Sequence, residues 1–269
     1  MVAAIGPALL LSGCLRSTAL LKVNADGSGT VENQIVMTSA SLAQVRQLAG
    51  LFGGSGTNPV DPFSEQQARD LARQMGDGVT LVSTRPLRDA GGEGREAIYA
   101  FPDVTKLRLS EAPAAPGDTS LSAGGLNLVG RQASSVTIDR VRTADGLVRL
   151  TFHTTADQLS GLTSRLGSPA GPGSTLPADQ MTMVRQMLGG LRVALRVQPA
   201  GRLIRTSSPY VDGQIVTLFD FDLDALLNDE AALARLQAAK TAGESAEALK
   251  GVKGIKVNLE RDITIEFAP

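Results

Sequence analysis

The stretch that decides the fold is SSVTIDRVRTADGLVRLTFHT, residues 134–154. Apolar and polar residues alternate along both of its halves, as they do in strands that bury one face. In the second half, Val148, Leu150 and Phe152 share one side of the strand, and the polar residues between them share the other. The central Ala144-Asp145-Gly146 is typical of a tight turn. The stretch therefore predicts a β-hairpin with strands at 134–143 and 147–154.

The same alternation recurs outward from this hairpin. It predicts further strands at 17–23, 30–37, 79–87, 95–101, 191–197, 202–206, 214–221 and 253–267. Helical spacing and capping residues predict helices after Ser41, after Ser64 (ending at Gly76), at 177–188, and at 225–238 with Asp224 as its cap. Short turns join most strands, which favours antiparallel pairing. We expect an α+β fold with mainly antiparallel sheet(s) and helices packed on one face.

Two long segments rich in small residues, 110–125 and 157–176, are predicted loops. Loops of this length are unusual inside a compact domain. We therefore expect an N-terminal part at 14–110, with the first hairpin, a helix pair and strands, and a second part at 125–269. The two parts form either separate units or one continuous domain.

The N-terminus carries an apolar run, residues 2–11, followed by Leu11-Ser12-Gly13-Cys14. A bilayer span needs about 20 residues, so the run fits the apolar region of a secretory signal. Leu-Ser-Gly-Cys is similar to the lipobox of bacterial lipoproteins, which implies a diacylglyceryl cysteine, further acylation by palmitate or a similar chain, and a membrane anchor at Cys14. No Lys or Arg precedes Cys14, so we expect residues 1–13 to be an incomplete signal peptide whose start lies upstream.

Composition excludes several classes of site. The chain has one His, one Cys and a net charge of −1. It lacks the ligands for a Cys/His zinc site or an iron–sulfur cluster, the second thiol for an internal disulfide, and the basic excess of a nucleic-acid binder. Asp220, Asp222 and Asp224 have the spacing of calcium ligands, but Ala225 stands where a calcium loop wants glycine. We expect no cofactor, metal or nucleic-acid partner.

Charge is unevenly distributed along the second part. Residues 131–206 hold ten Arg and four Asp, whereas residues 207–249 hold two basic and eight acidic residues. Outward positions of the predicted strands carry five arginines, which form the predicted contacts to an anionic ligand: Arg140, Arg142, Arg149, Arg192 and Arg196. Arginine suits the phosphate or carboxylate groups of lipid headgroups and glycans. Alternatively, these strands face the acidic helix at 225–238. His153 lies on a polar strand face, where we expect an exposed, non-catalytic side chain.

Three segments carry a family resemblance: Gly13-Cys14-Leu15 with the hairpin at 23–32, Pro199-Ala200-Gly201-Arg202-Leu203-Ile204, and Val211-Asp212-Gly213-Gln214-Ile215-Val216-Thr217-Leu218. The chain resembles the poorly characterised LppM-like bacterial lipoproteins. The resemblance implies an envelope lipoprotein that contacts lipids, and it offers no catalytic residues to carry over. Some such proteins carry a C-terminal membrane helix, whereas this sequence ends in a polar strand.

Together these patterns predict a non-enzymatic, extracytoplasmic envelope lipoprotein that binds a lipid, a glycan or an envelope protein. Leu15 follows Cys14 where an inner-membrane retention signal has Asp, which favours the outer membrane in a cell that has two. One alternative is a structural or assembly role through an exposed edge strand. Another is a hydrolase that uses two carboxylates about 5–10 Å apart in a cleft.

Overall fold

The computed structural model describes residues 15–39, 41–43, 63–89, 92–110, 122–123, 126–127, 135–153, 189–239, 241–258 and 260–269. Five predictions lie wholly or mostly outside these residues: Cys14 with its leader, the helix after Ser41 beyond Ala43, the loop at 110–125, the loop at 157–176 and the helix at 177–188.

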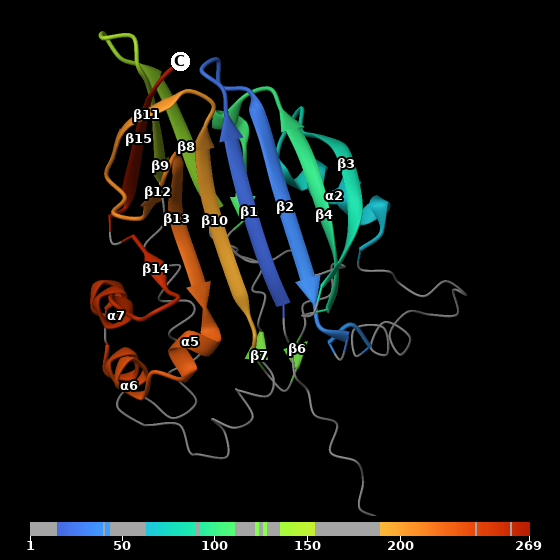
Figure 1. Ribbon diagram of the computed structural model, residues 1–269, viewed down its shortest axis with the longest axis vertical. Helices are drawn as coiled ribbons and strands as arrows, with labels where there is room; N and C mark the ends of the chain where they lie inside the picture. The colour runs from blue at the N-terminus through green and yellow to red at the C-terminus, as the bar shows by residue number, and fades with distance from the viewer. Residues whose placement is uncertain are drawn as a thin grey trace, which may run out of the picture.

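Two large sheets make up the described part of the chain (Figure 1). One has eight strands, in the order β12 (Val211–Asp212), β13 (Ile215–Asp222), β10 (Arg192–Pro199), β1 (Leu15–Val23), β2 (Gly29–Met37), β4 (Gly92–Phe101) and β3 (Thr80–Asp89), with β14 (Lys256–Val257) beside β13. The other has the order β11 (Arg202–Thr206), β15 (Asp262–Ala268), β9 (Val148–His153), β8 (Ser135–Arg142) and β5 (Leu109–Ser110). A small hairpin joins β6 (Ser122–Ala123) to β7 (Leu126–Asn127).

The predicted α+β class with mainly antiparallel sheets is confirmed. The β1–β10 pair is parallel, and every other pairing of the described strands is antiparallel. The hairpin predicted from residues 134–154 is present as β8 and β9, and its turn contains Gly146 at φ +81°. A positive φ strains residues with a Cβ, which explains the glycine.

One core lies between the two sheets, and Figure 1 shows β8, β9, β11 and β15 behind the β10–β13 side of the larger sheet. Inward residues of the larger sheet include Leu21, Val31 and Val197, and the smaller sheet contributes Leu150 and Ile265. The larger sheet and this core therefore draw residues from both predicted parts, 14–110 and 125–269.

The described helices lie in two places. Helix α2 (Glu65–Met75) packs beside β3 and buries Ala68, Ala72 and Met75 in the same core. Its predicted N-cap is confirmed, because the Ser64 side chain accepts a hydrogen bond from the Gln67 amide, and Gly76 ends the helix. Helices α5 (Leu223–Leu227), α6 (Glu230–Ala238) and α7 (Ala242–Leu249) form a second apolar cluster with the ends of β13 and β14. A short 3-10 helix, η1 (Val104–Lys106), precedes β5.

The helix predicted at 225–238 is present but is interrupted at Asn228 and Asp229, and its predicted cap, Asp224, is wrong. Two aspartates accept from helix amides instead: Asp222 caps α5 and Asp229 caps α6. Each cap stabilises a separate helix start, so the chain turns at Asn228 between two short helices.

The single long strand predicted at 253–267 is also wrong. It is divided into β14 in the larger sheet and β15 in the smaller one. The Asn258 side-chain amide donates to the carbonyl oxygens of Thr217 and Leu218. A side chain therefore binds the β13 carbonyls at the point where the backbone ladder between β13 and β14 would otherwise continue. Such local bonds compete with a strand ladder.

Candidate functional site

Two of the predicted arginines lie on the outward face of β10 and bind one carboxylate. Arg192 donates from Nε and Nη2 to Asp220 at 3.0 and 2.9 Å, and Arg196 Nη2 donates to the same carboxylate at 3.1 Å. The Asp220 side chain is only 3% exposed. Burial would raise its pKa, but the hydrogen bonds from the two arginines outweigh burial and lower it below the usual value.

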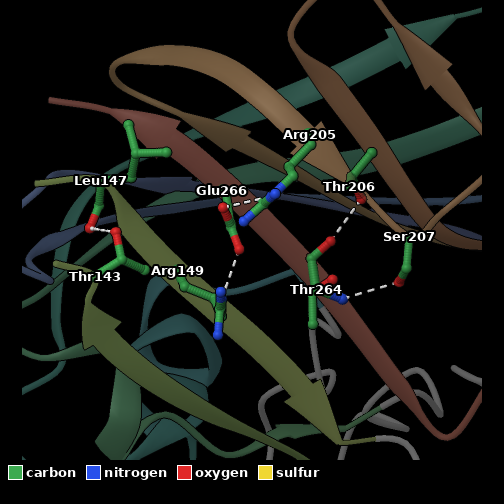
Figure 2. A network of polar contacts seen from close by, with 8 residues as sticks. All are labelled: Thr143, Leu147, Arg149, Arg205, Thr206, Ser207, Thr264 and Glu266. Carbon is green, nitrogen blue, oxygen red and sulfur yellow. Dashed lines mark hydrogen bonds and ion pairs between the residues drawn. The ribbon is translucent and has the colours of Figure 1, made fainter. Parts of the chain in front are cut away.

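A third predicted arginine belongs to a similar cluster on the outer face of the smaller sheet. Figure 2 shows Glu266 of β15 between Arg149 of β9 and Arg205 of β11. Their Nε atoms lie 2.6 and 2.7 Å from the two carboxylate oxygens. The hydrogen bond from Arg205, followed by that from Arg149, lowers the pKa of Glu266 against the opposing effect of burial.

The remaining two predicted arginines lie on β8. Arg140 packs over Gly27 and donates to the Ala25 carbonyl at 3.4 Å, while Arg142 is exposed. The five arginines are thus divided between two sheets and do not converge on one site. Where carboxylates pair with them in the described part of the chain, the carboxylates come from the neighbouring strands β13 and β15, not from the acidic helix.

His153 bridges three strands on the outer face of the smaller sheet. Its Nδ1 lies 2.8 Å from Asp262 of β15, and its Nε2 lies 3.1 Å from Asp139 of β8. Asp262, and then Asp139, raise the pKa of the imidazole by hydrogen bonding to its charged form. The two carboxylates lie on opposite sides of the ring, so they cannot join one ring nitrogen around a single metal ion. No metal-binding group of three acidic, His or Cys residues occurs within the described ranges.

The calcium spacing at Asp220, Asp222 and Asp224 does not produce a shared site. Asp220 is paired with arginines, Asp222 caps α5, and Asp224 is an exposed residue of the first helical turn. The spacing instead reflects a strand, β13, that ends at the cap of helix α5. The capping residue is Asp222, however, and not Asp224.

A hollow that the sequence patterns do not predict lies where β3 and β4 meet the start of α2. Its volume is about 300 Å³, near the lower end for small-ligand pockets. It is lined by Phe63, Thr84, Arg85, Pro86, Leu87, Arg88, Glu93, Gly94 and Arg95. Arg95 is only 4% exposed, and its Nη1 donates to the Ser64 carbonyl at 2.6 Å.

A signal for Arg95 was present in the sequence. Arg95, Ala97, Tyr99 and Phe101 alternate along the predicted strand at 95–101, and all four are buried in the structure. The strand prediction therefore already placed an arginine on a buried face. Its contact at Ser64 is 31 residues away along the chain, which alternation does not reveal.

None of the described helices is long and apolar enough to cross a membrane. Comparisons with known proteins give one structural likeness. No family model matches the chain, and no curated protein matches it. The NMR structure of the folded domain of LppM from Mycobacterium tuberculosis is similar at 11% identity and a TM-score of 0.34, over 98% of this chain and 95% of that one.

Proposed function

We propose that this chain is a lipid-anchored protein of the bacterial cell envelope, and that its two-sheet fold binds a partner outside the cytoplasm. The observation that carries the proposal is the apolar run at 2–11 followed by Leu11-Ser12-Gly13-Cys14, which holds the only thiol of the chain. A thiol directly behind such a run is where a membrane-embedded acylating enzyme would reach it. Two or more acyl chains hold a protein stably at a bilayer.

The start of the fold supports an anchor at this position. Strand β1 begins at Leu15, one residue after Cys14, and lies in the middle of the larger sheet. One residue spans at most about 3.6 Å, so a lipidated Cys14 would hold this end of the sheet at the bilayer surface. Leu15 pairs with Met37, and Met37 pairs with Glu93. The membrane-proximal end would therefore include the start of β4.

The polar clusters on the described sheet faces do not present the carboxylate pair that hydrolysis by paired carboxylates needs. Asp220 and Glu266 are each engaged by two arginines, and both nitrogens of His153 are engaged by aspartates. The two carboxylates beside His153 lie on an exposed sheet face, whereas a hydrolase of the carboxylate type needs its pair to flank a substrate. We propose a lipid, glycan or protein as the partner, and the outer membrane as the location in a cell with two membranes.

The anchor is tested by metabolic labelling with a palmitate analogue. We expect the wild-type protein and a Ser12→Ala control to incorporate label, and Cys14→Ser to incorporate none. Label that survives Cys14→Ser, or no label on the wild type, would refute the anchor. Native mass spectrometry with lipid extraction on the Cys14→Ser protein tests the partner class. A co-purifying lipid mass supports a lipid ligand, and a clean apo mass favours a glycan or protein partner.

A further inference from the structure

Arg95 is a buried cation whose described contacts leave it without a counter-ion. Its side chain is 4% exposed, and its hydrogen bond runs to an uncharged carbonyl oxygen, that of Ser64. Among the described residues, no carboxylate lies within ion-pair distance of it. A guanidinium has five N–H donors, and a buried charge without a partner is strongly unfavourable. By contrast, the carboxylates Asp220 and Glu266 on the outer faces each have two arginine partners.

The surroundings of Arg95 include the N-terminal end of α2, together with two carboxylates: Glu65 of the first helical turn, which pairs with Arg69, and Glu93 in the wall of the hollow. Ser64 is the N-cap of α2, and its carbonyl accepts from both the Ala68 amide at 3.2 Å and Arg95. The N-terminal end of a helix carries partial positive charge and amide groups without helical partners. Arg95 therefore meets the end of the helix that repels a cation. An anion at this point would be attracted by both the guanidinium and the helix.

The hollow provides the room for that anion. Arg95 lies in its wall with the rings of Phe63 and Pro86, and Arg88 is a second arginine of the same wall. Arg88 is 81% exposed, and its Nε lies 3.9 Å from Glu93. The wall of the hollow therefore contains one buried arginine, Arg95, and one exposed arginine, Arg88.

Two further polar atoms lie on the same inward sheet face. The Tyr99 hydroxyl and the Asn33 Oδ1 are buried and have no hydrogen-bond partner among the described residues. Arg95, Ala97 and Tyr99 are successive inward positions of β4, and Asn33 pairs with Ala97 across the β2–β4 ladder. Burial raises the pKa of Tyr99, and the nearby Arg95 guanidinium partly opposes this effect through its charge and through its interaction with the phenol oxygen. The tyrosine is therefore neutral and lies beside the guanidinium, but neither Tyr99 nor Asn33 is part of the wall of the hollow.

We propose that the hollow between Phe63, β3 and β4 is a binding site for an oxyanion of the phosphate type, held by the Arg95 guanidinium at the N-terminus of α2. A planar guanidinium and helix amides are the groups that bind such anions. The anion is either free phosphate or the phosphate of a lipid headgroup. The site itself does not depend on the lipid anchor at Cys14; only its place at the bilayer surface rests on the proposed function.

The test uses the full-length Cys14→Ser protein, so that a failure of the anchor cannot affect it. Inorganic phosphate is titrated at constant ionic strength set with sodium chloride, and the Arg95 Nε–Hε signal is followed by ¹H–¹⁵N NMR. We expect a saturable shift of this signal and of the Glu65 and Gln66 amides. The apparent Kd should rise at least tenfold in Arg95→Met and less than twofold in Arg73→Met, an exposed arginine of the same helix.

A second arm separates the two sources of phosphate. Phosphatidylglycerol vesicles replace inorganic phosphate, with the same variants. If free phosphate binds and the binding depends on Arg95, the site binds the free ion. If only the vesicles bind and that binding depends on Arg95, the site binds the phosphate of a lipid headgroup. No Arg95 shift with either probe, or a shift with a Kd unchanged in Arg95→Met, overturns the proposal. If Arg95→Met does not fold, the wild-type Arg95 signal and the Arg95→Lys variant decide whether the guanidinium binds phosphate. Lysine is informative here because it keeps the charge but loses the planar fork.

Discussion

Replacing Asp220 by asparagine should destabilise the fold by about 2 kcal/mol, because it removes the negative charge to which two arginines donate. Three hydrogen bonds of 2.9–3.1 Å end on this carboxylate. Removing one partner of a fully buried ion pair costs about 3–5 kcal/mol. The side chains of Arg192 and Arg196 are 42% and 35% exposed, so water replaces part of what they lose, and the expected cost is smaller.

The assay is urea unfolding followed by circular dichroism, with Glu32→Gln as the matched control. Glu32 lies on the same outward face and pairs with Lys22 at 2.5 Å, but both side chains are about a third or more exposed. Such a surface pair contributes about 0.2–1 kcal/mol. The reasoning is refuted if Asp220→Asn costs no more than Glu32→Gln.

The pH dependence of the same pair of variants gives a second check. Asp220 has a folded-state pKa below its unfolded value of about 3.9. Its contribution is therefore fully present above that unfolded pKa and is lost as the pH falls through the folded pKa. The stability difference between wild type and Asp220→Asn should be constant from about pH 5 to pH 8 and should shrink below about pH 4. A difference that persists unchanged at low pH would contradict the assignment.

Three other substitutions test local contacts. His153→Gln should lower stability by at most about 1 kcal/mol, and only while the ring is protonated. The raised imidazole pKa gives a contribution that is fully present below the unfolded pKa of about 6.5 and is lost as the pH rises through the folded pKa, which an NMR titration of the ring measures. Ser64→Ala should cost about 1 kcal/mol in urea unfolding through loss of the α2 cap, and Ser64→Gly only a few tenths. Gly201→Ala should lower the Tm by several degrees, because its Cβ would lie 1.7 Å from the Ala268 carbonyl oxygen, a backbone atom that cannot move aside.

Local alternation predicted most strands to within two or three residues, and particular residues explain why. In the 134–154 hairpin both strands and the turn are adjacent in sequence, so the pattern contains the pairing. The parallel pair of β1 with β10 joins Arg16 to Arg192 and Val23 to Pro199, and no local pattern carries a contact of that range. The prediction of one long strand at 253–267 was wrong for the same reason, because alternation cannot show that the two ends of the segment belong to different sheets.

The arginines illustrate what sequence could and could not predict about the site. Strand alternation correctly places Arg192 and Arg196 on the outward face of β10, but their partner Asp220 is set by the β10–β13 register. The role of Arg95 could not be predicted for the same reason. Its inward position follows from alternation, but its contact with the α2 cap follows only from tertiary packing.

The distribution of counter-charges favours an anion-binding site in the interior of the fold over one on its open sheet faces. A half-buried arginine that already donates to a buried carboxylate has fewer N–H groups for a ligand, and a ligand must compete with a partner that is fixed in place. That is the position of Arg149, Arg192 and Arg196. Arg95 is in the opposite position, because it is buried, donates to a carbonyl and faces the positive end of a helix. Electrostatics therefore favours anion binding most strongly at Arg95, although this arginine is buried from solvent.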